Sequence, residues 1–543
     1  MKEKIIYSKR KLRIRLKQHW QLYLLLAPPM LYLLIFNYAP LYGLIIAFED
    51  YKPYLGYLKS PFVGLQNFAR FFNSNKFGQV LPNTVILAFY SLLASFPFPI
   101  ILALCLNYIP STRFKKAVQN VSNPFICRLA PRETDCEAEW LGEGDSFTLC
   151  YSLRGQDSFT QVQTDTHFYR IENLQADREY ELYVVDYKGR QSPVRLIRTG
   201  ECVGTIVNYL HPEDTVYGFS GQYLCSPSII RLPGGSLLAS MDVFRGNAPQ
   251  NLQLLFGSDD GGGHWHYVTD IFPCFWGKLF WHQEKLFMLG VSREYGDLLI
   301  GCSEDLGRSW GTPTVILRGS SSSAEDGNHR APMCVLHSHG RLWTGTEYGS
   351  WHNRQFYASL LSIEEGADPM VAANWSLTEF VHPDVAFHAD LSGTPGGIEG
   401  NAVELPDGKV VDFLRYEKGK ALLLEAAPED PEAPMTAQRI VDFPLGHTKF
   451  DIERHTSGVY YACGNPFPGR TVLALYSSRD FVHWKREADV INRSEYDIKE
   501  IGFQYPSICF DGDDILILSR TAWNRPHNFH DSNFITFHRL SLT

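Results

Sequence analysis

The chain has 543 residues, of which 45% are hydrophobic and 20% are charged, and this composition excludes wholesale disorder. The net charge of -9 excludes a dominant basic surface, so we expect no nucleic-acid partner. At roughly 100–200 residues per domain, a chain of this length predicts about three or more domains.

Residues 1–120 have the pattern of a membrane segment. A basic tail precedes an uncharged apolar run at 22–48, and a second uncharged run follows at 80–109. Each run is long enough to cross a hydrocarbon core of about 30 Å. Because basic clusters flank the outer ends of both runs, both ends are expected in the cytoplasm. We therefore predict a two-pass segment of the bacterial plasma membrane, with the rest of the chain on the cytoplasmic side by the charge rule.

Four segments in this region resemble the start of oligosaccharide ABC-transporter permeases. They are PLYGLIIAFEDY (40–51), SPFVGLQNFARFF (60–72), LPNTVILAFYSLLASFPFPIILALCLN (81–107) and RFKKAVQ (113–119). The resemblance implies a permease truncated after two membrane segments, and for such a fragment we expect no ABC-transporter partners. Two other interpretations of the apolar runs are a signal peptide and the buried helices of a soluble protein. The resemblance stops near residue 120, which leaves a gene fusion and a join made during sequence assembly as alternatives.

Short alternating strands separated by turn residues predict a small β-sandwich at 124–200. Trp140 is placed to fill the centre of this sandwich. Leu174 followed by Tyr180 resembles the tyrosine corner of fibronectin type III domains. The resemblance implies a spacer or a carbohydrate-facing module without catalysis.

A strand–turn–strand unit recurs six times between residues 201 and 543. The turn centres lie near 234, 283, 340, 408, 458 and 512. A spacing of roughly 50–70 residues suits four-stranded propeller blades, and the terminal strand at 535–542 is expected to close the ring with 203–210. We therefore predict a mainly β chain with a six-bladed β-propeller, preceded by the β-sandwich and two transmembrane helices.

Two segments inside the repeats, 258–265 and 303–310, fit the pattern S-x-D-x-G-x-x-W, and 477–484 is a degraded copy. In such a turn the Ser and Asp tie down the hairpin, while Gly supplies a positive φ angle. The pattern resembles the Asp-box, or BNR repeat, of sialidase-like propellers over about 340 residues. This resemblance implies an exo-acting glycoside hydrolase whose pocket lies on the propeller axis.

Four residues match the pocket motifs of that family. The resemblance implies that Glu399 is the base, that Arg415 and Arg470 are two arginines of a carboxylate clamp, and that Tyr505 is the nucleophile. Guanidinium groups suit a carboxylate because their paired donors match its two oxygens. A tyrosine with a neighbouring glutamate suits covalent catalysis, because the carboxylate can take the phenol proton during attack.

Two positions depart from the family pattern. Cys225 stands where the first clamp arginine is expected, and the loop at 243–251 offers no acid. Asp242 is the nearest carboxylate and is therefore the candidate acid/base. A two-arginine pocket fits another acidic glycan, such as a uronic-acid-containing saccharide, as well as it fits sialic acid.

Further polar residues stand at the blade entrances. His329 and Arg330 precede the inner strand of the third unit and are candidates for substrate binding, since a histidine can act as acid or base near neutral pH. His527, His530 and Asp531 cluster in the last loop, but no ligand spacing supports a metal site, so we expect no metal and no cofactor. The 11 cysteines include no CxxC pair and are expected to be mostly free and buried.

The function that these patterns favour is a sialidase-like glycoside hydrolase acting on a glycan that contains an acidic sugar. One alternative is a carbohydrate-binding propeller without catalysis, because one arginine and one aspartate of the family pattern are missing. The other alternative is a truncated sugar-transporter permease, which only residues 1–120 support.

Overall fold

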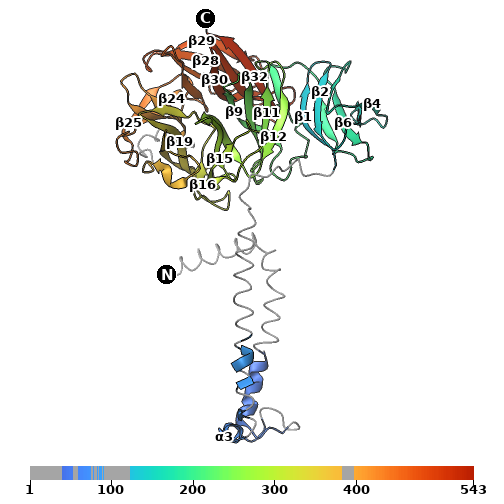
Figure 1. Ribbon diagram of the computed structural model, residues 1–543, viewed down its shortest axis with the longest axis vertical. Helices are drawn as coiled ribbons and strands as arrows, with labels where there is room; N and C mark the ends of the chain where they lie inside the picture. The colour runs from blue at the N-terminus through green and yellow to red at the C-terminus, as the bar shows by residue number, and fades with distance from the viewer. Residues whose placement is uncertain are drawn as a thin grey trace. The chain divides into compact units, whose positions relative to one another are not determined.

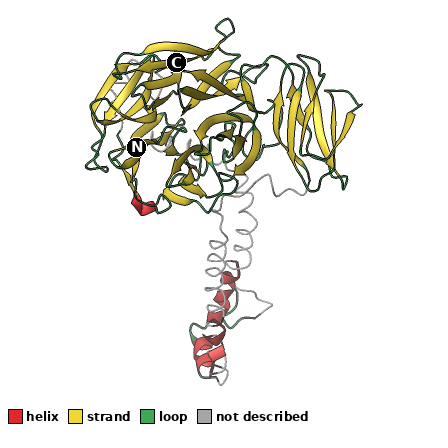
Figure 2. Ribbon diagram, turned by 45° about the horizontal axis from the view of Figure 1, so that its top comes forward, coloured by secondary structure: helices red, strands yellow, loops and turns green. Residues whose placement is uncertain are grey.

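The computed structural model describes residues 39–52, 59–74, 123–381 and 397–542, with a few further positions between 77 and 90. The chain divides into two compact units, residues 1–109 and 110–543. Strands make up nearly all of the regular structure in the second unit (Figure 2). The mainly β fold expected from the sequence is therefore confirmed.

The described part of the first unit contains the helices η2 (Ala39–Phe48) and α3 (Gln66–Phe72). The Asn67 side-chain amide donates hydrogen bonds to the carbonyls of Glu49, at 2.8 Å, and Ala47, at 3.3 Å, and so ties α3 to the end of η2. The predicted runs at 22–48 and 80–109 lie mostly outside the described residues. Within the described residues, no helix has the length and apolar character needed to cross a membrane.

Two antiparallel sheets form the N-terminal part of the second unit. The first contains β1 (Phe125–Pro131), β2 (Cys136–Leu141) and β5 (Phe168–Ile171), and the second has the order β4 (Thr160–Thr164), β3 (Phe147–Leu153), β6 (Glu179–Asp186) and β7 (Arg195–Arg198). Every second residue of β6 is buried, as expected for a strand with one face on a core.

Aromatic residues fill the core between these two sheets. The Trp140 side chain is 1% exposed and packs edge-on against Phe147, with the ring centroids 5.9 Å apart. The Tyr180 hydroxyl accepts a hydrogen bond from the Gln175 backbone N–H at 2.8 Å. This contact fixes the turn before β6 to the strand itself.

Six further sheets follow one another along the chain (Figure 1). Sheet one contains β9 (Tyr223–Arg231), β10 (Leu237–Phe244), β11 (Gln253–Ser258) and β12 (His266–Ile271); sheet two contains β13 (Phe275–His282), β14 (Lys285–Val291), β15 (Leu298–Ser303) and β16 (Thr314–Leu317). Sheet three contains β17 (Gly327–His329), β18 (Leu336–Ser338), β19 (Arg341–Ser350), β20 (Gln355–Glu364) and β21 (Trp375–Leu377), with the short helix η3 (Ala372–Asn374) before its last strand.

The remaining three sheets repeat the same antiparallel order. Sheet four contains β22 (Ile398–Glu404), β23 (Val410–Glu417), β24 (Lys420–Glu425) and β25 (Thr436–Asp442); sheet five contains β26 (Asp451–Arg454), β27 (Tyr460–Gly464), β28 (Val472–Ser478) and β29 (Lys485–Asn492). Sheet six contains β30 (Gly502–Asp511), β31 (Asp514–Ala522), β32 (Phe534–Ser541) and, from far earlier in the chain, β8 (Thr205–Tyr209).

The pairing of β8 with β32 closes these sheets into a ring, because a strand from before sheet one completes sheet six. Side-chain hydrogen bonds connect the inner strands across the seams between sheets. The Ser507 hydroxyl accepts the Ile229 N–H at 3.2 Å, and the Ser228 hydroxyl accepts the Leu279 N–H at 3.1 Å. Such bonds satisfy backbone donors that would otherwise be buried without a partner.

The S-x-D-x-G-x-x-W segments form hydrogen-bonded turns. In the first, the Gly262 N–H donates to the Ser258 hydroxyl at 2.9 Å, and the Trp265 indole N–H donates to the Gly262 carbonyl at 3.2 Å. The second repeats both bonds, at 2.8 Å and 3.1 Å. In the degraded third copy, Ser478 rather than Ser477 accepts the turn N–H, from Phe481 at 2.9 Å. One residue is therefore missing from that turn.

Strand β1 joins the sandwich to the ring and is buried along its whole length. The Arg128 guanidinium pairs with Glu137 at 3.1 Å and donates to the Val207 carbonyl on β8 at 2.9 Å. Glu139 accepts the Tyr267 N–H of sheet one at 2.8 Å. Charged side chains thus connect the sandwich to both the closing strand and the first sheet.

Candidate active site

Four inner strands carry a β-bulge that faces a shared cavity. The bulge residues are Ser226 on β9, Trp276 on β13, Glu399 on β22 and Tyr505 on β30, where the ladder register shifts. Their φ angles are +43°, +51°, +57° and +49°, in the left-handed region that non-glycine residues rarely adopt. Bulges re-aim side chains, and strained backbone concentrates at functional sites. All four residues line one cavity of about 390 Å³.

Tyr505 and Glu399 form a hydrogen-bonded pair in this cavity. The Tyr505 hydroxyl donates to Glu399 Oε1 at 2.7 Å, and Arg415 Nη1 donates to Glu399 Oε2 at 2.8 Å. Glu399 is only 2% exposed, so the carboxylate is held in a nearly dry place with both oxygens engaged. Burial raises the pKa of Tyr505 well above its usual range, and the Glu399 carboxylate adds to the rise. The tyrosine is therefore a neutral donor to a carboxylate that can accept its proton.

Arg470 lies over the Tyr505 ring. Its guanidinium carbon is 5.8 Å from the Tyr505 ring centroid and 5.4 Å from that of Phe529, and Nη1 donates to the Gln504 side chain. Burial lowers the pKa of Arg470 to about 10, so the group stays charged at neutral pH. The four residues matched by motif, Glu399, Arg415, Arg470 and Tyr505, thus line one cavity although they come from three sheets.

The structure adds Arg520, which the sequence motifs missed. Arg520 is 1% exposed and lines the same cavity, and its guanidinium carbon lies 5.2 Å from the Tyr505 ring centroid. In the β30–β31 ladder Arg520 is opposite Gln504, the residue before the bulge. Arg415 is likewise opposite Ile398, the residue before the Glu399 bulge. Arg415 and Arg520 thus occupy equivalent positions in sheets four and six, and this equivalence could have identified Arg520 from the sequence repeats.

Asp242 does not belong to the described lining of the cavity. It is fully buried, and its two carboxylate oxygens each accept the Trp276 backbone N–H at 3.0 Å. Burial raises the pKa of Asp242 well above its usual range. Asp242 therefore holds the Trp276 bulge in place instead of reaching a substrate, which corrects its assignment as the acid/base.

His329 and Arg330 both line the cavity, and both are buried. His329 Nδ1 lies 2.9 Å from Glu347 Oε2, and Glu347 Oε1 accepts the Gly400 N–H at 3.0 Å. Glu347 thus connects His329 to the backbone of the Glu399 bulge. Burial lowers the pKa of Arg330 to about 10, and its Nη1 is buried with no hydrogen-bond partner among the described residues.

Three other cavity residues, Glu294, Trp351 and Phe244, had no motif to reveal them, whereas His530 belongs to the polar cluster noted in the last loop. Burial lowers the pKa of His530 to about 4, and the charge on Arg520 contributes, so this histidine is neutral at pH 7. Four arginines then face two carboxylates in the lining, so positive charge is in excess. Such a cavity favours an anionic ligand.

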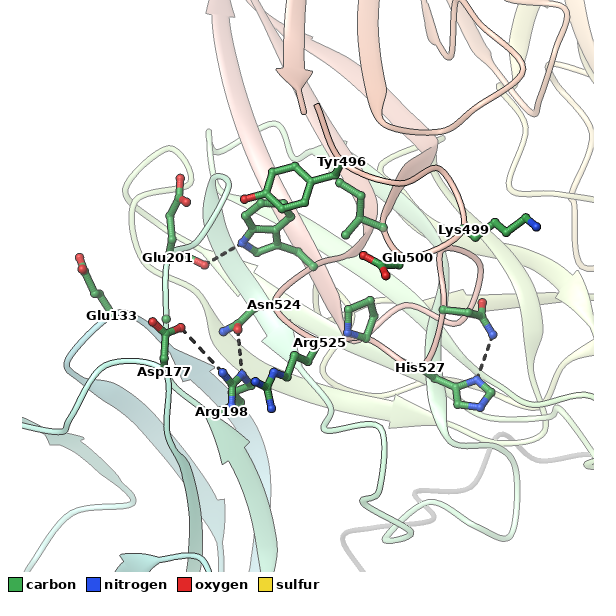
Figure 3. Close-up of a pocket in the computed structure, with 15 residues that line it drawn as sticks. Glu133, Asp177, Arg198, Glu201, Tyr496, Lys499, Glu500, Asn524, Arg525 and His527 are labelled. Atoms are coloured by element: carbon green, nitrogen blue, oxygen red, sulfur yellow. Dashed lines mark hydrogen bonds and ion pairs between the residues drawn. The ribbon is translucent and has the colours of Figure 1, made fainter. Parts of the chain in front are cut away.

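A larger groove of about 690 Å³ lies between the sandwich and sheets five and six (Figure 3). Within it, Arg198 donates to the Asn524 side chain at 3.0 Å and lies 3.8 Å from Asp177. His527 lines this groove and hydrogen-bonds Asp531 at 2.7 Å, and His530 reaches the same carboxylate at 3.0 Å. Among the described residues, no group of histidine, cysteine, aspartate or glutamate side chains could hold a metal ion. We therefore place the candidate active site in the smaller cavity.

The molecule thus combines a mainly β ring of sheets with a positively charged cavity that contains a Tyr–Glu pair. No known protein-family profile matches the chain. The N-terminal region is 49% identical over 104 residues to Protein LplB of Bacillus subtilis strain 168, which covers 19% of this chain and 33% of LplB. It is 44% identical over 120 residues to the polygalacturonan/rhamnogalacturonan transport system permease protein YteP of the same organism, covering 22% of this chain and 37% of YteP.

The chain therefore spans about a third of the length of these curated relatives, and the expected resemblance of the N-terminal region to sugar ABC-transporter permeases is confirmed. Among solved structures, the Penicillium chrysogenum α-L-arabinanase is 12% identical, with a TM-score of 0.43, over 63% of this chain and 98% of the arabinanase. The leech intramolecular trans-sialidase is 10% identical, with a TM-score of 0.41, over 80% of this chain and 95% of that enzyme. These structural neighbours are glycoside hydrolases of the arabinanase and sialidase type.

Proposed function

We propose that residues 201–543 form a six-bladed sialidase-like propeller that hydrolyses glycosidic bonds to an acidic sugar. The observation that carries this proposal is the hydrogen bond from the Tyr505 hydroxyl to Glu399 in a cavity with excess positive charge. A phenol paired with a carboxylate can become a nucleophile, because the carboxylate takes its proton as the oxygen attacks. Covalent glycosidase chemistry of this kind needs such an activated nucleophile.

The arginines bind the substrate in this proposal. Arg415, Arg470 and Arg520 surround the Tyr–Glu pair, and Arg330 adds a buried guanidinium nitrogen without a partner among the described residues. A carboxylate on the sugar satisfies these donors and neutralises the excess charge. The clamp then holds the anomeric carbon near Tyr505, and positioning alone can supply several kcal/mol of the barrier reduction.

The size of the cavity supports exo action. Its volume of about 390 Å³ lies near the lower end of the range for ligand pockets, roughly 300–1,000 Å³. Such a cavity accommodates a terminal sugar unit better than the interior of a long chain. The remaining sugars of the glycan then extend out of the cavity mouth, past the exposed Trp351 side chain.

The acidic sugar is either a sialic acid or a uronic acid. One permease relative of the N-terminal region has a name that refers to polygalacturonan, a polymer of uronic acid. This relationship supports including uronic acids among the candidate substrates. The test is hydrolysis of a panel of sialosides and uronic-acid glycosides by the full-length protein, with neutral glycosides as controls. Turnover of an acidic glycoside and none of its neutral counterpart is the expected result.

The alternative function is carbohydrate binding without catalysis. The aromatic side chains of Trp276, Trp351 and Phe244 in the lining favour it, because aromatic rings stack on sugars. Binding of an acidic saccharide, measured by calorimetry, without hydrolysis of any glycoside in the panel would establish this alternative. Absence of both binding and turnover would contradict both functions.

We propose the following organisation for the rest of the chain. Residues 124–200 form a fibronectin type III-like spacer, which the Tyr180 hydroxyl contact supports. Residues 1–120 form a truncated permease-like segment whose runs at 22–48 and 80–109 anchor the chain in the plasma membrane with the propeller on the cytoplasmic side. Labelling of single engineered cysteines in intact cells tests this topology, because an impermeant reagent that labels the propeller would place it outside.

A further inference from the structure

The proposed hydrolysis leaves one chemical role without a residue. When the glycosidic bond breaks, the departing oxygen of the second sugar needs a proton, and a sugar alkoxide is a poor leaving group without one. Two carboxyl groups, Glu294 and Glu399, are found in the described lining of the cavity. Both oxygens of Glu399 are already engaged, by Tyr505 and by Arg415. Glu294 is thus the carboxyl group that the Tyr–Glu pair does not use.

Glu294 is held in a defined place at the cavity wall. It lies in the connection between β14 and β15 of sheet two, whereas Glu399 and Tyr505 come from sheets four and six. Gln250 is fully buried, and its side-chain amide donates to Glu294 Oε2 at 2.5 Å. A carboxyl group held by a buried amide is positioned for proton transfer.

The surroundings of Glu294 favour its protonated form. The carboxyl group is partly buried, and burial raises its pKa, although the charges of His329 and Arg293 and the hydrogen bond from Gln250 work in the opposite direction. A partly buried glutamic acid that shares a cavity with a second carboxyl group in a different environment, Glu399, is the arrangement that separates an acid from a base in one site.

The two histidines of the cavity are poorer donors. Burial lowers the pKa of His530 to about 4, so His530 carries no donatable extra proton at neutral pH. His329 is surrounded by the rings of Trp276 and Phe356, at 4.7 Å and 4.6 Å, and its Nδ1 is engaged by Glu347. His329 therefore serves the packing and positioning of sheet three.

We propose that Glu294 is the acid/base residue of this cavity, an inference that rests on the proposed hydrolase function. In the first step the Tyr505 oxygen bonds to the anomeric carbon and its proton passes to Glu399. The glycosidic carbon–oxygen bond breaks, and the leaving oxygen takes the proton of Glu294. In the second step the Glu294 carboxylate takes a proton from water as the water oxygen bonds to the anomeric carbon. The Tyr505 oxygen leaves and recovers its proton from Glu399.

The test compares two substrates of the full-length protein that share one acidic sugar and differ in the leaving group. One carries a 4-nitrophenol, which departs without protonation, and the other carries a second sugar. Glu294→Gln should lower kcat/KM by about 100-fold or more for the saccharide and by less than about tenfold for the nitrophenyl glycoside. The alkaline limb of its pH–rate profile should disappear. The exposed Glu429→Gln is the matched control and should leave both rates unchanged.

Equal losses for the two substrates, or no loss, would overturn the assignment of Glu294 while leaving the hydrolase function intact. Inactivity of the unmodified protein on both substrates would instead refute the hydrolase function, and the role of Glu294 with it. If Glu294→Gln melts at a lower temperature than the control, Glu294→Asp supplies the same comparison. That variant keeps an ionisable acid, so it should retain the alkaline limb and lose rate mainly on the saccharide.

Discussion

Arg520 donates a hydrogen bond to Cys225, with Nη1 3.0 Å from the sulfur. Cys225 stands on β9 where the family pattern has an arginine, and Arg520 comes from β31 of the neighbouring sheet. The small thiol leaves room for the guanidinium that enters from the other side. With Arg330, Arg415 and Arg470, Arg520 brings the arginines of the described lining to four, which corrects the expectation of a two-arginine pocket.

Arg520→Lys should weaken binding of an acidic sugar by roughly 1–3 kcal/mol, because an ammonium group cannot form the paired donors of a guanidinium. Calorimetric titration with N-acetylneuraminic acid and galacturonic acid measures the effect. The exposed Arg479→Lys serves as control. Unchanged affinity for both acids would remove Arg520 from the clamp.

Tyr505→Phe should lower turnover on the order of 10³-fold or more while leaving substrate affinity nearly intact, since only the nucleophilic oxygen is removed. Steady-state rates and calorimetric binding on the same preparation separate the two effects. Full activity of this variant would exclude Tyr505 as the nucleophile.

Glu347→Gln should lower kcat more than it changes KM. Glu347 contacts Gly400 and His329 behind the cavity, so its loss displaces the Glu399 bulge without removing a substrate contact. A charged hydrogen bond of this kind contributes about 1.5–3 kcal/mol. The exposed Glu304→Gln is the control. A rise in KM alone would show that Glu347 acts on binding instead.

Trp140→Ala should destabilise the sandwich by about 3–5 kcal/mol, because it empties the space that Trp140 fills against Phe147. Urea unfolding followed by fluorescence measures the loss. Tyr187, whose side chain is 57% exposed on the same sandwich, provides the control variant Tyr187→Ala. Equal stabilities of the two variants would contradict the placement of Trp140 in the core.

The melting temperature should fall as the pH is lowered from 7 towards 4. Burial lowers the pKa of His538 from 6.5 to about 4, so between these values the unfolded chain binds a proton that the folded chain does not. The free energy of unfolding therefore rises with pH across this window and levels off above about 6.5. His538→Gln should reduce the slope, whereas the exposed His352→Gln should not. Identical slopes for His538→Gln and the unmodified protein would exclude His538 as a source of the pH dependence of stability.

Motif spacing was sufficient to place Glu399, Arg415, Arg470 and Tyr505 around one cavity, because each stands at a recognisable position relative to the hairpin turn of its own repeat. The burial of Asp242 could not be predicted from the sequence, because a single bulge on the neighbouring strand β9 determines which side chains face the cavity. Glu294 lies in a loop without a motif, and only the closed ring brings it into the same cavity as Glu399. The mainly β class followed from the repeated hairpins alone.

The pairing of β8 with β32 also determines which changes of chain connectivity the ring tolerates at its two ends. Phe537 lies opposite Thr205 in that ladder, so the first and last strands of residues 201–543 are lateral neighbours. A covalent link across the seam, with a new opening at the exposed Gly512 turn, would give a circular permutant that keeps every strand partner. The same adjacency means that sequence added before β8 need not interrupt any sheet. A leading segment can therefore be joined before β8 while every strand pair of the ring is kept.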